Sequence, residues 1–413
     1  MATKKKKVED VEIKDEEVFY DDITNDKLIT IFDGKDQTEA EIQKDLQRRF
    51  AHADKKKKGN QLFLQTGCTP FDLAVSNGKG LPVGCALLFY AERGTGKTTL
   101  IADVLYRILK RAHAGNVPYK VLYIDIEGSS SLLESMGLDE FIEDGSLKLL
   151  QMSVNFKQLD VIYKDIVLNK EPFEDIKLVV IDSINSVVAP ETLQNDITKA
   201  EFGNKAKYRG KFYEKYIPIC FERGITNIFI SQVRQEQGAT MYQEAIRPAV
   251  TSADLHWVDV VMKLTKQAGK DAQVPEIEDV SKTSTMGDYA DRTRYMMKFA
   301  SWGASAKNLK NRFFKAPEIR CLAEYGKGIN NWFTLRVMLT QLGFFIGDGG
   351  RPVKYSMNED IKELFNSDDV NQDKYTREEL NTLCKKYNRP IIDFLTDRGL
   401  YKLTLEEESE DNE

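Results

Sequence analysis

The chain has 413 residues, of which 41% are hydrophobic and 30% charged, enough for one large domain or two modest ones. No apolar run approaches the ~18 to 20 residues of a membrane helix, and no apolar stretch follows the basic N-terminus, so neither a membrane protein nor a secretory leader is predicted. The net charge of -6 is not typical of a nucleic-acid-binding protein, although basic runs allow a local basic surface. Five scattered cysteines without a CxxC pair argue against a zinc ribbon or disulfide framework and favour the cytoplasm.

The first 65 residues divide into two predicted segments. Residues 1–37 form a mixed-charge extension with little apolar content, which is typical of a mobile tail. A capping box begins at Thr38, and Ile42, Leu46 and Phe50 follow at helical spacing, which predicts an amphipathic helix at about 38–51 within the segment 38–65. Its apolar stripe needs a partner, either a neighbouring subunit or the rest of this chain.

Residues 66–333 alternate between apolar runs and helical stretches. Apolar runs predict strands at 85–90, 121–124, 178–181 and 225–230, and helices are expected at 97–113, 156–168 and 203–223. Two further strands are expected at 258–264 and 295–299, separated by a polar surface insertion at 267–293. Continuous apolar strands that alternate with helices predict an α/β fold with a mostly parallel sheet covered on both faces.

The last part of the chain becomes helical and polar from about residue 334. A second capping box, Thr376-Arg377-Glu378-Glu379, predicts the start of a helix. We expect a small α-rich C-terminal domain at 334–404, followed by an acidic tail at 405–413.

The segment after the first predicted strand has the pattern of a phosphate-binding loop. It reads Ala91-Glu92-Arg93-Gly94-Thr95-Gly96-Lys97-Thr98 and leads into the helix expected at 97–113, with Ala91 where the pattern usually has glycine. The nucleotide is expected to contact this segment and the next residue, Thr99. Glycines let backbone N–H groups close around phosphate oxygens, and a helix N-terminus adds partial positive charge. We expect Lys97 to reach the β- and γ-phosphates of ATP and Thr98 to ligate Mg²⁺.

Polar residues follow three other predicted strands, at the edge where parallel sheets bind ligands. Asp182 is the candidate Walker B carboxylate that holds Mg²⁺, unless it is an ordinary turn residue. Glu127 is the candidate general base for the water that attacks the γ-phosphate, unless it is a solvated acid. Gln232 is placed to sense the γ-phosphate and signal to the following loop, unless it is a turn amide.

Taken in chain order, these motifs resemble the RecA recombinase family. Residues 65–100 read QTGCTPFDLAVSNGKGLPVGCALLFYAERGTGKTTL, which is similar to the TG-x-x-x-LD-x-AL segment, GLP-x-G turn and P-loop of that family. YIDIE at 123–127 resembles the family's catalytic-glutamate strand, VIDS at 180–183 resembles its Walker B strand, and SQVR at 231–234 resembles its NQ-[IV]-R strand. Further along, KNR at 310–312 resembles its KNK motif, and YGKGIN at 325–330 resembles its YGEGI motif. The resemblance covers roughly residues 38–350.

The resemblance implies a RecA-type P-loop ATPase core with an N-terminal polymerisation helix. It also implies an ATP-dependent recombinase that forms head-to-tail filaments on single-stranded DNA and pairs this with homologous double-stranded DNA. Lys310 and Arg312 match cations that reach the γ-phosphate of the neighbouring subunit, unless they lie on a basic surface strand. Tyr325 and Gly326 match positions that contact adenine, and Tyr325 is expected to do so from the next subunit.

Two loops are expected to touch DNA, at 195–204 and 234–252. Phosphates would be neutralised by Lys199, Lys205, Arg234 and Arg247, and bases would stack on Met241 or Tyr242. Each of these residues could instead be a solvated loop residue. The sequence departs from the family at VTSA (250–253), where the family has TGG, and lacks the usual adenine-facing tyrosine after Glu127. This divergence suggests a bacteriophage recombinase that acts in the host cytoplasm.

Two other functions stay open on the same core. A hexameric helicase uses an arginine finger and an N-terminal collar, for which residues 1–37 are too short, and a RadA-type repair motor carries an N-terminal zinc finger, which the cysteine spacing excludes. A filament scaffold that binds ATP without hydrolysing it would need neither Glu127 nor Gln232. The predicted function is therefore that of a recombinase with DNA-dependent ATPase activity.

Overall fold

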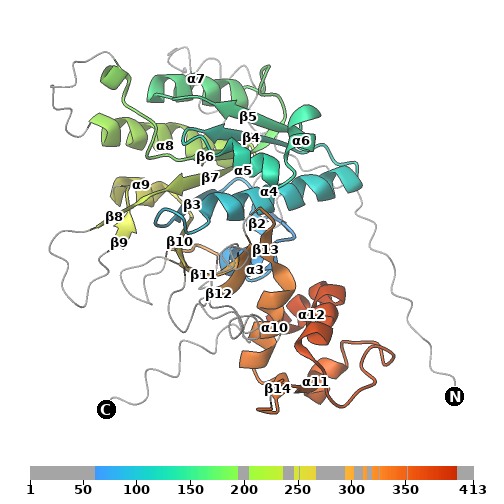
Figure 1. Ribbon diagram of the computed structural model, residues 1–413. Helices are drawn as coiled ribbons and strands as arrows, with labels where there is room; N and C mark the ends of the chain where they lie inside the picture. Colours follow the sequence, from blue (N-terminus) through green and yellow to red (C-terminus); the bar gives the residue numbers. More distant parts are fainter. Residues whose placement is uncertain are drawn as a thin grey trace, which may run out of the picture. The chain divides into compact units, whose positions relative to one another are not determined.

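The computed structural model describes residues 61–193, 204–235, 246–250, 252–266, 294–301, 310–313, 319–324, 326–350 and 352–397 (Figure 1). These residues belong to one compact unit, Lys57–Glu413. The helix expected at 38–51, the insertion expected at 267–293 and the acidic tail lie outside the described residues.

A nine-stranded sheet is the centre of the described structure. Across it the strands are β13 (Gly328–Asn330), β12 (Ile319–Glu324), β11 (Arg294–Ser301), β10 (Val260–Lys266), β3 (Ala86–Tyr90), β7 (Thr226–Ser231), β6 (Ile176–Asp182), β4 (Lys120–Asp125) and β5 (Leu147–Gln151). Strands β10 to β5 run parallel to their neighbours, whereas β11, β12 and β13 are antiparallel additions. The predicted α/β fold with a mostly parallel sheet is therefore confirmed. Every residue of β3 and β7 is buried, which explains their continuous apolar sequences.

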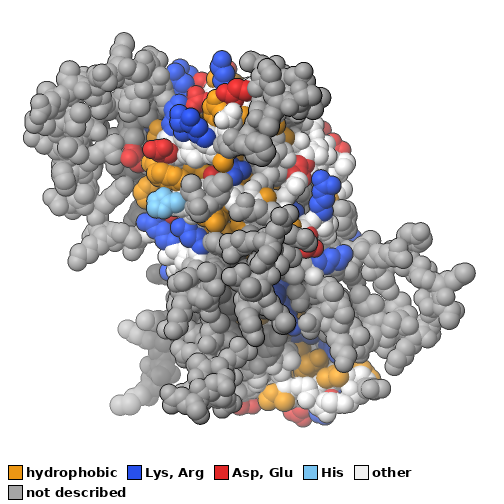
Figure 2. Space-filling view, turned by 90° about the vertical axis from the view of Figure 1, so that its left-hand side faces the viewer, with side chains coloured by type: hydrophobic (Ala, Val, Ile, Leu, Met, Phe, Trp, Pro, Cys, Tyr) orange, Lys and Arg blue, Asp and Glu red, His pale blue; other side chains and the backbone are white. Residues whose placement is uncertain are grey.

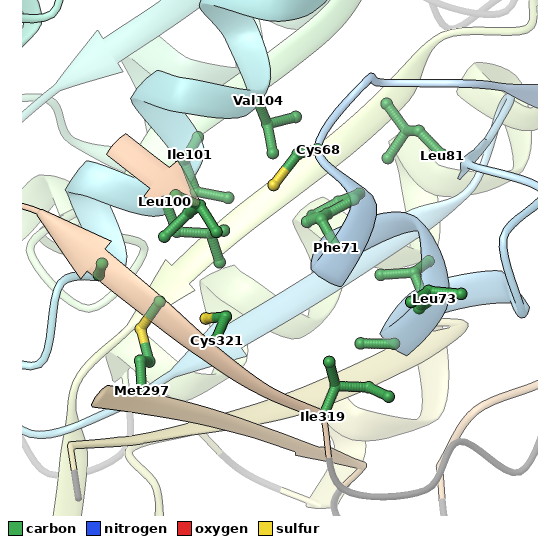
Figure 3. Close-up of a cluster of buried hydrophobic side chains, with 14 of the residues drawn as sticks. Cys68, Phe71, Leu73, Leu81, Leu100, Ile101, Val104, Met297, Ile319 and Cys321 are labelled. Carbon is green, nitrogen blue, oxygen red and sulfur yellow. The ribbon is translucent and has the colours of Figure 1, made fainter. Parts of the chain in front are cut away.

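One face of the sheet is covered by α3 (Thr69–Ser76) and α4 (Lys97–Ala114). Leu100, Ile101 and Val104 of α4 are buried at helical spacing, and they share a hydrophobic cluster with Phe71 of α3 and Cys321 of β12 (Figure 3). Alternate residues of β3, β4, β6 and β7 belong to the same cluster, as expected where successive side chains point to opposite faces. This packing fixes the position of the first turn of α4 relative to the end of β3.

The other face is covered by α7 (Phe156–Val167) and α8 (Asn204–Glu222). The Tyr163 hydroxyl of α7 donates to Asn227 Oδ1 of β7 at 2.8 Å, and the ring of Tyr213 in α8 lies 5.0 Å from that of Phe229 in β7. A capping box at Asn155 starts α7. Helices thus lie on both faces of the sheet, which buries its central strands.

The C-terminal helices α10 (Asn331–Gln341), α12 (Arg377–Lys386) and α13 (Asn388–Asp397) follow the sheet. The capping box predicted at Thr376 is confirmed, since its hydroxyl accepts from Glu379 N and the Glu379 carboxylate accepts from Thr376 N. Leu339 of α10 and Leu380 of α12 belong to the same buried cluster as α4. The domain boundary expected at 333/334 lies within α10, and the division into 66–333 and 334–404 stays a prediction.

Several elements were not predicted from the sequence. They include β5, β12 and β13 of the main sheet and a set of short elements: β1 (Phe63–Leu64), β2 (Leu81–Pro82), β8 (Val233–Gln235), β9 (Ile246–Pro248), β14 (Phe345–Gly347), β15 (Tyr355–Met357), α5 (Ser130–Ser135), α6 (Asp139–Glu143), α9 (Ser252–Trp257) and α11 (Glu359–Lys362). Within the described ranges, no helix combines the length and the apolar character of a membrane span. All five cysteines are free and buried.

Candidate functional site

Four neighbouring strands end at the same edge of the main sheet. Asp182, the last residue of β6, lies opposite Asp125 of β4 and Ile230 of β7, and Ser231 of β7 lies opposite Tyr90 of β3. The residues that follow these strands are therefore neighbours in space, although they are far apart in the sequence. This edge brings together the predicted phosphate loop, Walker B carboxylate, general base and switch glutamine.

The loop between β3 and α4 is shaped by two glycines. Gly94 and Gly96 have φ angles of 72° and 99°, in the region that favours glycine. Ala91 is buried and has no positive φ, so alanine fits without backbone strain where the sequence pattern usually has glycine. Lys97 Nζ donates to the carbonyl oxygens of Ala91 and Glu92, at 2.9 and 3.0 Å. Burial lowers the pKa of Lys97, and the carboxylates of Asp182 and Glu127 act in the opposite direction.

Thr98 and Asp182 are in direct contact at the base of this loop. Thr98 Oγ1 donates to Asp182 Oδ2 at 2.8 Å, and the Tyr123 hydroxyl donates to the same oxygen at 2.9 Å. Burial raises the pKa of Asp182 to about 6, against the effect of these two hydrogen bonds. A hydroxyl and a carboxylate are oxygen ligands of the kind that Mg²⁺ prefers, and a cation would offset the cost of the buried charge. The donor set of Thr98 and Asp182 therefore fits a magnesium ion.

Glu127 is surrounded by hydrogen-bond donors. Its Oε1 accepts from Ser183 Oγ at 2.5 Å, Gln232 Nε2 at 2.8 Å and Ser186 Oγ at 3.3 Å. Partial burial acts to raise the pKa of Glu127, but the hydrogen bonds from these three side chains lower it below its ordinary value. The side chain is ionised near neutral pH, so it can accept a hydrogen bond from a water molecule. Glu127 and Gln232, which were both expected at this edge of the sheet, are thus in direct contact.

Two serines that contact Glu127 were not predicted from the sequence. Ser183 and Ser186 both reach Glu127 from the turn after β6. The available signal was a pair of hydroxyl residues directly after a strand that ends in an acid. That signal is weak, because serine is common in turns for local reasons.

Lys310 and Arg312 lie at the other end of the strands, where β10 and β3 begin. Asn311, between them, forms a β-bridge with Val260 at the start of β10, and Arg312 Nη1 pairs with Asp259 Oδ1 at 3.1 Å. The start of β10 lies beside the start of β3, whereas the glycine loop follows the end of β3. The length of the strand separates the two places by roughly 15 Å. The structure therefore does not bring these cations to the loop of their own chain.

Gly326 lies close to Ser135 of α5 in its own chain. A Cβ built on Gly326 would be 3.8 Å from Ser135 Oγ, and Gly326 lines a cavity of about 520 Å³ with Tyr106 and Met136. Tyr325 lies outside the described residues.

The predicted DNA-contacting residues are divided between described and undescribed segments. Lys205 is in the first turn of α8, where its ammonium donates to Asn185 O and burial lowers its pKa. Arg234 and Arg247 lie opposite each other in the β8–β9 hairpin. The remaining three, which lie outside the described residues, are Lys199, Met241 and Tyr242. Figure 2 shows the face on the left of Figure 1, where lysine and arginine side chains are mixed with acidic and apolar ones.

Comparison with known proteins identifies the family. A model of the RecA N-terminal domain matches residues 37–255, which is more than half of the chain. The chain belongs to the RecA family. The match to the RecA domain includes the glycine loop and the ends of β4, β6 and β7, so the whole edge described above lies within it.

Curated relatives named Protein RecA are distant. The chain is 25% identical to the protein from Mycoplasma pneumoniae, over 46% of this chain and 52% of the relative. It is 27% identical to that of Crocosphaera subtropica, over 43% and 46%, and 27% identical to that of Mesomycoplasma hyopneumoniae, over 45% and 54%. The chain thus spans about half the length of the RecA proteins it matches. The match confirms the predicted RecA family and fold.

Proposed function

We propose that this chain is an ATP-dependent DNA recombinase, which forms filaments on single-stranded DNA and promotes homologous pairing and strand exchange. The observation that carries the proposal is the edge at which Thr98 contacts Asp182 and Glu127 contacts Gln232. These contacts unite a phosphate loop, a metal-binding pair, a water-orienting carboxylate and a sensor amide in one place.

The roles of these residues follow from their contacts. The glycine loop and Lys97 bind the phosphates. Thr98 and Asp182 would hold Mg²⁺, which would neutralise phosphate charge. Glu127 accepts a hydrogen bond from the attacking water and orients it toward the γ-phosphate. Gln232 exchanges its contact with Glu127 for one with the γ-phosphate and so reports that ATP is present.

The positions of Lys310 and Arg312 support a head-to-tail assembly. In one chain these cations lie at the edge of the sheet opposite the glycine loop. Head-to-tail stacking places the opposite edges of two subunits against each other, so the cations of one subunit reach the nucleotide of the next. Such contacts join ATP binding to filament growth, with the predicted helix at 38–51 as a second contact between subunits.

The decisive experiment compares ATP hydrolysis with and without single-stranded DNA, together with strand exchange and electron microscopy of the same sample. We expect hydrolysis to rise sharply with DNA, filaments to form and strand exchange to proceed, and Lys97→Ala to abolish turnover. Duplex unwinding without strand exchange would assign the chain to the helicases and repair motors. Filaments without hydrolysis would make it a scaffold, and a lack of any response to DNA would reject the proposal.

The contribution of the N-terminal helix is tested separately. A chain that lacks residues 1–53 should keep nucleotide binding but form no filaments, because the apolar stripe of the predicted helix would no longer contact a neighbour. Filaments of unchanged length in electron micrographs would remove the helix from this role.

A further inference from the structure

Asn185 is a half-buried residue in the turn after β6, and its side chain joins three segments that are far apart in the sequence. Its Oδ1 accepts from Gln232 N at 3.0 Å and from Ser231 Oγ at 2.7 Å, and its Nδ2 donates to Ala249 O at 2.5 Å. The amide therefore uses both ends at once. The oxygen binds Gln232, which contacts Glu127, and the nitrogen binds Ala249, which directly follows β9.

The base of the β8–β9 hairpin is closed by the same group of contacts. Ala249 N donates to Gln232 O at 2.8 Å, directly across the hairpin. Asn185 binds the remaining two backbone groups, the N–H of Gln232 and the carbonyl of Ala249. A shift in the backbone of Gln232 must therefore move Ala249 or break a hydrogen bond in a half-buried place, where lost bonds are costly.

The backbone of Asn185 makes a further connection, to α8. The Lys205 ammonium donates to Asn185 O from the first turn of that helix. The adjacent Ser186 hydroxyl contacts Glu127 Oε1 at 3.3 Å. A two-residue turn thus touches Glu127, the Gln232 segment, the hairpin and the start of α8.

We propose that Asn185 is a positioning residue that couples the Glu127–Gln232 pair to the β8–β9 hairpin and the first turn of α8, so that nucleotide and single-stranded DNA raise each other's affinity. The proposal rests on the recombinase function proposed above. When the backbone of Gln232 moves as its side chain turns toward a γ-phosphate, the hydrogen bond to Asn185 moves Asn185 as well. The hydrogen bond from Asn185 to Ala249 then passes this movement to the hairpin. Linkage then requires that DNA bound near the hairpin favour the ATP-bound state by the same factor.

The test measures two affinities for the full chain: that for a non-hydrolysable ATP analogue without DNA, and that for a single-stranded oligonucleotide with either the analogue or ADP. In Asn185→Ala the analogue should still bind, because Asn185 holds Gln232 but does not contact the glycine loop in the described structure. The ratio of the two DNA affinities should fall by about five- to tenfold. A merely structural role would leave that ratio unchanged.

Two further variants keep the result interpretable. Asn185→Asp is close in shape and keeps the acceptor for Gln232 N and Ser231 Oγ, but it cannot donate to Ala249 O, so it should lose the coupling even if Asn185→Ala is poorly folded. Asn358→Ala is the matched control, since Asn358 also binds a backbone N–H, at the start of α11, away from the candidate site.

Each outcome decides one point. Loss of the ratio in both Asn185 variants, with a normal ratio in Asn358→Ala, supports the coupling role. A wild-type ratio in Asn185→Asp overturns it while leaving the recombinase function intact. If the wild type binds DNA equally with the analogue and with ADP, the recombinase function and the coupling role both fail.

Discussion

Glu127 combines a low pKa with three hydrogen-bonded neighbours, and this combination defines what the carboxylate can do. Since Ser183, Ser186 and Gln232 donate to the same oxygen, Oε1, they fix the orientation of the side chain. The hydrogen bonds that lower the pKa of Glu127 keep the carboxylate ionised and hold it in one orientation. Such a carboxylate can accept a hydrogen bond from the attacking water, in keeping with the role proposed for Glu127.

Replacing Glu127 by glutamine tests this role. The amide has nearly the same size and can still accept from Ser183, so ATP binding should be retained. Without the charge, turnover should fall by about 10² to 10⁴-fold. Binding of a fluorescent ATP analogue and phosphate release should be measured on the same preparation, and full turnover in Glu127→Gln would remove the residue from its role.

A second residue-scale prediction concerns Asp72, a buried carboxyl in α3. Its Oδ1 accepts from Thr66 Oγ1 at 2.6 Å, but burial raises its pKa from 3.8 to about 7. Because the folded pKa is the higher one, the folded state keeps a proton that the unfolded state loses between about pH 4 and 7. Stability should therefore fall as the pH rises through this window and level off above it.

The variant Asp72→Asn cannot titrate and isolates this effect. When the pH is raised from about 5 to about 8, the free energy of unfolding of the wild type should fall by roughly 2 to 4 kcal/mol more than that of Asp72→Asn. Denaturant titrations at several pH values measure this difference. A difference that is the same at both ends of the range would mean that Asp72 is already ionised at the lower pH.

At the scale of elements, the sequence predicted the strands that are buried on both faces. β3, β6 and β7 read as continuous apolar runs, and they lie in the centre of the sheet. β5 and β12 were missed because they lie toward the sides of the sheet and carry polar residues, such as Lys148 and Arg320. Such sequences resemble surface segments until their neighbours are known.

The candidate site was predictable to the same extent. Lys97, Asp182, Glu127 and Gln232 each follow a predicted strand, and parallel strands end at one edge, so their meeting could be expected. The role of Asn185 could not, because an asparagine after a strand usually serves a local turn. Its contacts depend on Ala249, which is 64 residues away.

The packing of β13 against α4 gives a prediction at the same scale. Gly328 has a φ of 90°, and a Cβ built on it would lie 2.3 Å from Asp103 Oδ1 of α4. Gly328→Ala should therefore push β13 away from the helix and destabilise the fold by about 1 to 3 kcal/mol. Thermal unfolding measures the loss, with Gly145→Ala as the control: Gly145 also has a positive φ, but its Cβ would meet nothing within 4 Å. Equal losses would assign the effect to backbone strain alone.

At the scale of the whole molecule, the separation of the two parts of the proposed site can be tested by mixing. Lys97→Ala keeps the cations at one edge, and Arg312→Ala keeps the loop at the other, so each variant alone should be inactive. In a random mixture, about one interface in four joins an intact loop to an intact segment 310–312. The mixture should therefore hydrolyse ATP at about a quarter of the wild-type rate.

The contrary result is equally clear for this mixture. If Lys310 and Arg312 acted within their own chain, no pairing of the two variants could assemble a complete site. The mixture would then be as inactive as its components at every ratio of the two proteins.

The opposite placement of the glycine loop and the segment 310–312 also sets the stoichiometry of any open assembly. A linear chain of subunits always has one loop that no neighbour completes, so it contains one complete site fewer than it has subunits. Short oligomers should therefore hydrolyse less ATP per subunit than long filaments, whereas a closed ring would show no such dependence on size. The two ends of such an assembly also differ chemically. A subunit added at one end supplies its segment 310–312 to the exposed glycine loop of the last subunit. A subunit added at the other end supplies its glycine loop to an exposed segment 310–312.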